Sequence, residues 1–162
     1  MAVPVDVLRR VPLLAGLRDD ELAELSTRFR ERAYDRGAPV VSRGSSGTGF
    51  FVVAEGKATV SAGGRELGRL GRYDYFGEVS LIDGGRRSAD ITAETNMRCW
   101  GISKREFEAF VKAHPEVAWT LLEGLATRLR AAEAAPREPR VRARRGWPRG
   151  PGRSARPPAP PR

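Results

Sequence analysis

Residues 71–89 of this 162-residue chain read GRYDYFGEVSLIDGGRRSA and contain the most informative pattern in the sequence. From Phe76 to Ile82 they predict a glycine turn followed by a single helical turn between two strands. The first N–H groups of a helical turn have no partner within the helix, so they favour a bound anion. Gly77 lacks a side chain, which lets a ligand approach the backbone closely. The segment therefore predicts an anion site.

An arginine with a suitable shape follows in the same segment. Arg87 stands nine residues after Glu78, and its planar guanidinium group matches two phosphate oxygens. Ser88 adds a hydroxyl donor beside it. A carboxylate at Glu78 would repel a phosphate, so we expect it either to accept hydrogen bonds from a sugar hydroxyl or to brace the arginine. The predicted ligand combines an anion with a polyol.

The sequence around this segment is rich in short β-forming runs. Runs of Val, Phe and Thr, separated by glycine turns, predict six strands at residues 38–43, 48–54, 57–62, 65–70, 88–94 and 97–102. Many short strands at regular spacing indicate an antiparallel sandwich or barrel. We predict a mainly β fold with flanking helices, in the form of a jelly-roll-like β-barrel.

Helical periodicity flanks the predicted barrel on both sides. Residues 5–34 have apolar side chains at helical spacing, and a proline and a glycine break them into two short helices. After the barrel, Ser103 and Glu106 have the spacing of a capping box. Pro115 suits the first position of a last, lid-type helix.

An apolar stripe follows one side of the last predicted helix. Val117, Leu121, Leu125 and Leu129 repeat every four residues. Packing on the barrel is the plain interpretation of this stripe. A homodimer, in which a second copy of the chain packs on the same helix, is the alternative.

These segments together resemble the cyclic-nucleotide-binding domain family, which includes bacterial catabolite-activator-type regulators and the regulatory subunits of cyclic-AMP-dependent kinase. The resemblance covers about residues 5–132. It includes LRRVPLLAGL at residues 8–17, FFVVAEG at residues 50–56 and the segment 71–89. A Phe-Gly-Glu sequence with an arginine nine residues after its glutamate, inside a glycine-punctuated β region, is a specific signal.

The resemblance implies a ligand-binding set of six residues, namely Gly77, Glu78, Val79, Arg87, Ser88 and Arg128. Gly77 and Glu78 match the ribose-binding pair of the family, with Glu78 accepting the 2′-hydroxyl. Arg87 matches the arginine that neutralises the cyclic phosphate, and Ser88 matches a phosphate-side hydroxyl. Arg128 falls where a base-side arginine is expected, on the helix that closes over the base. The implied ligand is cAMP, with cGMP as the alternative, and no cofactor is expected.

Three features depart from the family pattern. Arg86 replaces the proline that usually precedes the phosphate arginine, and it adds a second positive charge near the expected phosphate. Ala132 and Glu133 stand where catabolite-activator-type regulators have hydroxyl residues that contact adenine. No helix-turn-helix segment is identified after the last helix. The base preference is therefore open.

The net charge of +9 is concentrated at one end of the chain. Residues 136–162 contain nine Arg and one Glu, which leaves residues 1–135 nearly neutral. With eight Pro and few apolar side chains, residues 136–162 are predicted to be a disordered basic tail, and residues 1–135 the binding domain. The alternative function is a degenerate, ligand-free module whose tail binds nucleic acid nonspecifically.

A few single residues and missing motifs argue against several other classes of protein. Cys99 is the only cysteine and is expected in the core, so neither a disulfide nor a thiolate cluster is expected. His114 is the only histidine, and we expect a structural role for it and no metal site. Without a cluster of metal ligands or a nucleophile motif, the chain is not expected to be an enzyme. Neither a membrane span nor a signal peptide is identified. We expect a cytoplasmic sensor that acts on an unknown downstream protein through its last helix.

Overall fold

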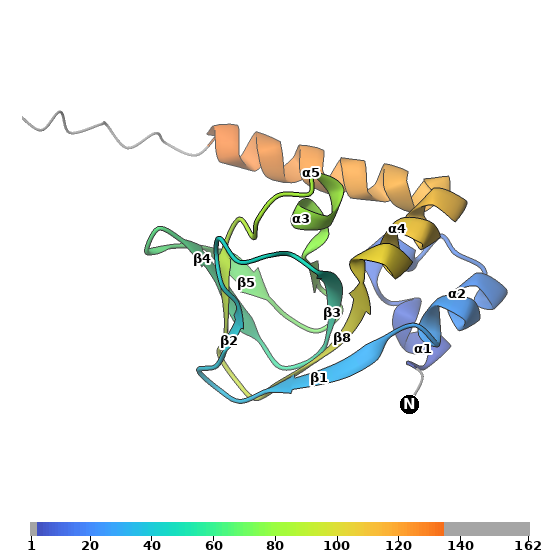
Figure 1. Ribbon diagram of the computed structural model, residues 1–162, viewed down its shortest axis with the longest axis horizontal. Coiled ribbons are helices and arrows are strands. Elements are labelled where there is room, and N and C mark those ends of the chain that lie inside the picture. Colours follow the sequence, from blue (N-terminus) through green and yellow to red (C-terminus); the bar gives the residue numbers. More distant parts are fainter. Residues whose placement is uncertain (1–2, 135–162) are drawn as a thin grey trace, which may run out of the picture.

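The computed structural model describes residues 3–134, which form two four-stranded antiparallel sheets flanked by helices (Figure 1). The first sheet has the order β1-β8-β3-β6 and the second the order β2-β7-β4-β5. The strands are β1 (Arg30–Tyr34), β2 (Pro39–Val41), β3 (Gly49–Glu55), β4 (Ala58–Ala62), β5 (Arg65–Leu70), β6 (Tyr75–Phe76), β7 (Asp90–Ala93) and β8 (Met97–Ser103). The predicted jelly-roll-like fold with flanking helices is confirmed.

The six predicted strands are all present, with ends that move by two residues at most. The helical prediction for residues 5–34 is wrong at its C-terminal end, because Arg30–Tyr34 forms β1 and pairs with β8. The sequence of β1 is largely charged and lacks the apolar alternation that marks a strand, because most of its side chains are exposed and no face of it requires apolar residues. The two-residue strand β6 is too short to have a pattern, and it was not predicted.

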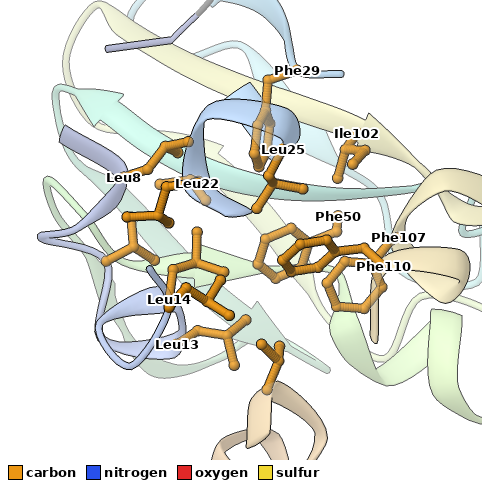
Figure 2. Packing of buried hydrophobic residues seen from close by; sticks show 14 of the residues in the cluster. Leu8, Leu13, Leu14, Leu22, Leu25, Phe29, Phe50, Ile102, Phe107 and Phe110 are labelled. Carbon is orange, nitrogen blue, oxygen red and sulfur yellow. The ribbon is translucent and has the colours of Figure 1, made fainter. Parts of the chain in front are cut away.

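Three short helical segments precede the barrel, where the sequence predicted two. They are α1 (Val5–Leu8), the 3₁₀ segment η1 (Pro12–Leu14) and α2 (Asp19–Ser26). Their leucines meet the aromatic residues Phe50, Phe107 and Phe110 in one buried cluster (Figure 2). Phe50 of β3 stacks on Phe107, with ring centroids 4.5 Å apart. This cluster fixes the N-terminal and C-terminal helices against the same end of the barrel.

Two helices follow β8. The first, α4 (Lys104–Ala113), begins at the predicted capping box, in which Ser103 Oγ accepts a hydrogen bond from the Glu106 N–H at 3.3 Å. The second, α5 (Pro115–Ala134), begins at the predicted proline and passes over α3 (Glu78–Ile82) beside the barrel (Figure 1). Val117 and Leu121 are buried, whereas Leu129 is exposed. Packing on the protein therefore accounts for only the first half of the apolar stripe.

A second apolar cluster lies between the two sheets and contains Cys99. Burial raises the pKa of the Cys99 thiol to about 12, which keeps it protonated at neutral pH. The expected core role of this cysteine agrees with that position.

The predicted disordered tail, residues 136–162, lies outside the described residues, and so does its predicted binding to nucleic acid. The domain boundary at residue 135 stays a prediction. Within residues 3–134, no helix combines the length and the apolarity required to cross a bilayer.

Candidate functional site

A pocket of about 810 Å³ lies between the second sheet, the start of α3 and the underside of α5. Its lining includes the whole predicted ligand-binding set, Gly77, Glu78, Val79, Arg87, Ser88 and Arg128. The first three residues come from the start of α3, the next two from the segment before β7, and the last from α5. The fold thus brings three separate parts of the chain to one pocket.

Gly77 turns the chain from β6 into α3. Its φ of 97° lies in the left-handed region, which glycine adopts without strain. A Cβ on Gly77 would also lie 2.5 Å from Nη1 of Arg87 and 2.5 Å from the carbonyl oxygen of Gly49. Only glycine fits this position, and the turn directs the buried Glu78 side chain into the pocket wall.

Arg87 is buried, with only 8% of its surface exposed. Its Nη2 donates to the carbonyl oxygen of Gly49 at 2.8 Å, and its Nη1 donates to Oγ of Ser80 at 3.0 Å. Within residues 3–134, no carboxylate forms an ion pair with Arg87. Burial lowers the pKa of Arg87, and the nearby charge of Glu78 opposes this shift. The guanidinium group is therefore a buried cation without a direct counter-ion, which an anion in the pocket would supply.

Glu78 pairs with Arg128, across the pocket from α3 to α5. The Glu78 side chain is 3% exposed and the Arg128 side chain 53% exposed, so the pair joins a buried carboxylate to a cation at the rim. The guanidinium carbon of Arg128 also lies 5.6 Å from the centroid of the Tyr75 ring. The alternative expectation, that Glu78 braces Arg87 directly, differs from this arrangement, because the ion-pair partner of Glu78 is Arg128.

Arg86 and Arg87 have different surroundings although they are neighbours in sequence. The Nη1 of Arg86 donates to the carbonyl oxygen of Gly44 at 2.7 Å, and Arg86 forms a β-bridge with Ser46. Arg86 is exposed and is not part of the pocket lining. Arg86 therefore links the loop before β3 to the segment before β7, and its charge does not lie in the pocket, where a second positive charge was expected.

Several apolar side chains line the pocket, beside charged side chains of β5 such as Arg65 and Glu66. Ala131 and Ala132 line it from α5, and Leu70 and Ile91 line it from the second sheet. A flat aromatic base would bury apolar surface here. Neither alanine side chain offers a hydrogen bond that would distinguish one base from another.

Three residues that the sequence did not single out support the site. Ser80 and Gly49 supply the two oxygen atoms that hold Arg87. Tyr75 packs beneath α5, where a Cβ on Gly124 would lie 3.0 Å from its hydroxyl oxygen. Ser80 stands only seven residues before Arg87, so the spacing of a hydroxyl residue to the arginine was a signal that could have found it. The contacts of Gly49 and Tyr75 join residues far apart in sequence, and no spacing rule would have found them.

The fold and the pocket define a jelly-roll barrel with a buried arginine in its pocket and a helix crossing the pocket mouth. The chain belongs to the cyclic nucleotide-binding domain family, whose model matches residues 31–114. Its homologues include regulators of the cyclic AMP receptor type and regulatory subunits of cAMP-dependent kinases. The resemblance inferred from the sequence is confirmed.

Two curated relatives illustrate the similarity. The chain is 35% identical over 127 residues to the "Cyclic AMP receptor protein" of Thermus thermophilus, an alignment that covers 75% of this chain and 59% of that protein. It is 38% identical over 109 residues to the "cAMP-dependent protein kinase regulatory subunit" of Mycosarcoma maydis, covering 62% of this chain and 21% of that protein. The chain therefore spans less than two thirds of the length of either relative.

Solved structures agree with the family assignment. The crystal structure of the Thermus thermophilus catabolite activator protein superposes with a TM-score of 0.69 at 34% identity, covering 75% of this chain and 60% of that one. The N-terminal domain of a transcriptional regulator from Streptomyces coelicolor superposes with a TM-score of 0.61 at 37% identity, covering 82% of this chain and 99% of that one.

Proposed function

We propose that this module is a sensor of a cyclic nucleotide, with cAMP as its primary ligand, and that ligand binding acts on α5. The observation that carries the proposal is the state of Arg87. It is a buried guanidinium group in the wall of a pocket, held by one carbonyl and one hydroxyl oxygen, and no carboxylate among the described residues forms an ion pair with it. A bound phosphate would compensate a charge that the surrounding residues leave uncompensated.

The phosphate-side residues are proposed to be Arg87 and Ser88, while Gly77, which belongs to the ribose-binding pair, and Val79 complete the ligand-binding set at the start of α3. All four line the pocket, and the guanidinium group has a fixed orientation because Gly49 and Ser80 hold it. A planar donor that is already oriented loses little conformational entropy when it binds two phosphate oxygens. Ser88 is exposed at the pocket edge, where its hydroxyl is free to turn toward a phosphate.

The ribose-side residue is proposed to be Glu78, and its pair with Arg128 supports a link to α5. A sugar hydroxyl that donates to Glu78 would share or replace the contact that Arg128 makes in this structure. Because Arg128 lies on α5, any change in that contact alters what holds α5 over the pocket. The ligand would then shift the population of α5 positions, which is the form of signal we propose for a downstream protein.

The ligand base is proposed to lie against Ala131 and Ala132. Relatives named for cAMP, such as the cyclic AMP receptor protein of Thermus thermophilus, support cAMP as the first candidate. A relative named "cGMP-dependent protein kinase", from Toxoplasma gondii, is 28% identical, which keeps cGMP as the second candidate. Since the two alanines cannot donate or accept hydrogen bonds through their side chains, we expect weak discrimination between the two bases.

Calorimetric titration of the wild type with cAMP, cGMP and linear AMP tests the ligand class. We expect both cyclic nucleotides to bind more tightly than linear AMP. Arg87→Ala should weaken cAMP binding by about 2–5 kcal/mol, the scale for truncating one partner of a buried charge pair. The neighbouring Arg86→Ala is the matched control, because Arg86 does not line the pocket, and it should stay within about threefold of wild type.

Two outcomes would contradict the proposal. One is equal affinity of the wild type and Arg87→Ala for cAMP. The other is linear AMP that binds as tightly as the cyclic forms. If Arg87→Ala fails to fold, Arg87→Lys keeps the charge but lacks the planar fork, and it should still lose most of the affinity. No catalytic role is proposed for the module.

A second copy of the chain is the proposed partner of the outer face of α5. Trp119, Leu122 and Leu129 are exposed on α5, although they are large and apolar. Together with Ala126 they follow the three- and four-residue spacing of a coiled-coil seam, which is distinct from the buried Val117 and Leu121. A helix with two apolar sides and only one of them covered is typical of an interface.

Analytical ultracentrifugation tests this pairing. The wild type should sediment as a dimer, and the double variant Leu122→Gln/Leu129→Gln as a monomer. Ile82→Gln is the control, because Ile82 is exposed to a similar extent but lies at the end of α3. A wild type that stays monomeric at high concentration would rule out the dimer.

A further inference from the structure

We propose that Glu21, His114 and Glu116 form a binding site for a divalent transition metal ion, with zinc as the representative ion, at the junction of α2 with the start of α5. The site is separate from the nucleotide pocket and does not depend on the function proposed for it. His114 is the only histidine of the chain, and Glu21 stands far from it in sequence. The fold brings the imidazole and two carboxylates together, so that one potential ligand atom of each lies within 4.8 Å of the others.

The distances are those that a small tetrahedral ion requires. Nδ1 of His114 lies 3.3 Å from Oε1 of Glu21 and 3.5 Å from Oε1 of Glu116. Ligands about 2.0–2.1 Å from a tetrahedral zinc ion are about 3.3–3.4 Å from one another. Neither contact appears among the hydrogen bonds of residues 3–134. Two edges of the coordination tetrahedron are therefore present before an ion binds.

The three side chains are held to different degrees. The side chains of Glu21 and His114 are only 13% and 14% exposed, and the His114 ring packs on Phe110 with centroids 4.4 Å apart. Glu116 is 52% exposed and can adjust its rotamer to close the remaining oxygen–oxygen distance. Its exposure also leaves room for a water molecule as the fourth ligand. Two fixed ligands and one adjustable ligand suit an ion that enters from solvent.

The local charge favours a cation. Arg18 forms ion pairs with Asp20 and Glu21. Two carboxylates thus share one guanidinium group, and Glu116 adds a third carboxylate next to His114. Because Asp20 offers Arg18 a partner of its own, Glu21 can exchange Arg18 for a metal ion without leaving that arginine unpaired.

The ligand types determine the class of ion. An imidazole nitrogen with two carboxylate oxygens suits zinc, copper or nickel, whereas magnesium and calcium prefer oxygen ligands alone. Glu21 lies in the first turn of α2 and Glu116 in the first turn of α5, so the two carboxylates come from separate helices. A bound ion would join α2 to the N-terminal end of the helix that crosses the nucleotide pocket.

Zinc titration by calorimetry, in the absence of nucleotide, tests the site. We expect one zinc ion per chain and no binding of magnesium at the same concentrations. His114→Ala and Glu116→Gln should each weaken zinc binding by more than about tenfold, since even the loss of an outer-shell partner typically costs about 10- to 100-fold in metal affinity. Glu133→Gln is the matched control on the same helix, and it should leave zinc binding unchanged.

The single histidine gives a second, independent readout in the unaltered chain. Zinc should shift the ring nitrogen resonances of His114 in a nuclear magnetic resonance spectrum, without the need for a variant. The proposal is overturned if zinc does not bind, if His114→Ala binds zinc as tightly as wild type, or if zinc binds while the His114 resonances stay in place. Since cAMP is absent from these experiments, their result is independent of the nucleotide proposal.

Discussion

Glu78 and Arg128, fifty positions apart in the sequence, form an ion pair that joins α3 to α5 across the mouth of the pocket. The carboxylate is buried and the guanidinium group is half-exposed, so the pair is a contact between the inner wall of the site and the helix above it. A nearly buried carboxylate that loses its cation keeps its desolvation cost. The stability of this region therefore depends on α5 being in place.

The first prediction concerns this pair. Arg128→Ala should lower the free energy of unfolding by about 1–3 kcal/mol, the scale for a hydrogen bond to a charged group that is left unmade. Urea denaturation measures this difference. Arg130→Ala, two positions further along the exposed side of the same helix, should change stability by less than about 0.5 kcal/mol. Equal losses in the two variants would mean that the ion pair contributes nothing specific.

The second prediction separates crowding from backbone strain at Gly77. Gly77→Ala places a Cβ against Arg87 and the Gly49 carbonyl group, at a residue whose φ is positive. The variant should lower the free energy of unfolding by more than about 3 kcal/mol and should also lose nucleotide binding. Gly84→Ala has a similar φ of 69° but no atom within 4 Å of the added Cβ. It should cost only about 1–2 kcal/mol, the penalty of the left-handed region. Thermal unfolding and calorimetry of both variants test this difference.

The third prediction concerns the contact between β6 and α5. In an open helix interior, Gly→Ala stabilises by about 0.5–1 kcal/mol. At Gly124 the added Cβ would lie 3.0 Å from the Tyr75 hydroxyl oxygen, so Gly124→Ala should not give this gain. In a Tyr75→Phe background the same substitution should become stabilising. A double-mutant cycle measured by urea denaturation gives the coupling, and additive effects would contradict the contact.

The fourth prediction uses the raised pKa of Cys99. Its folded-state pKa of about 12 lies above the ordinary value of 9.0, because burial disfavours the thiolate. The folded state therefore holds the thiol proton more tightly, and the stability from this group is complete below about pH 9 and is lost as the pH rises toward 12. Between about pH 9 and pH 12, the free energy of unfolding of Cys99→Ala should fall less steeply with pH than that of the wild type. Parallel slopes in the two proteins would argue against a buried thiol.

The fifth prediction concerns base recognition. Ala132→Thr adds a hydroxyl group to the lining of the pocket and should change the ratio of cAMP to cGMP affinity by about two- to tenfold, the scale of one hydrogen bond. Competition titration of the two nucleotides measures this ratio. Ala118→Thr, on the same helix but outside the pocket lining, is the control and should leave the ratio unchanged.

Much of the fold could be predicted because its signals are local. Six strands, the helical turn after Gly77, the capping box at Ser103 and the proline start of α5 depend on residues a few positions apart. The strands β1 and β6 have no such signal. The first has exposed side chains without apolar alternation, and the second has two residues, so both form only because a partner strand accepts their backbone hydrogen bonds.

The candidate site also has a part that could be predicted from the sequence and a part that could not. The sequence alone determined the family, the jelly-roll barrel and the identities of Glu78 and Arg87, since glycine turns and a fixed spacing of charged residues are properties of the chain itself. Only the tertiary structure decided the partners: Arg128 for Glu78, and Ser80 and the Gly49 carbonyl group for Arg87. These contacts join residues from separate elements. The packing of helices on the barrel sets their distances, and no spacing in the sequence encodes that packing.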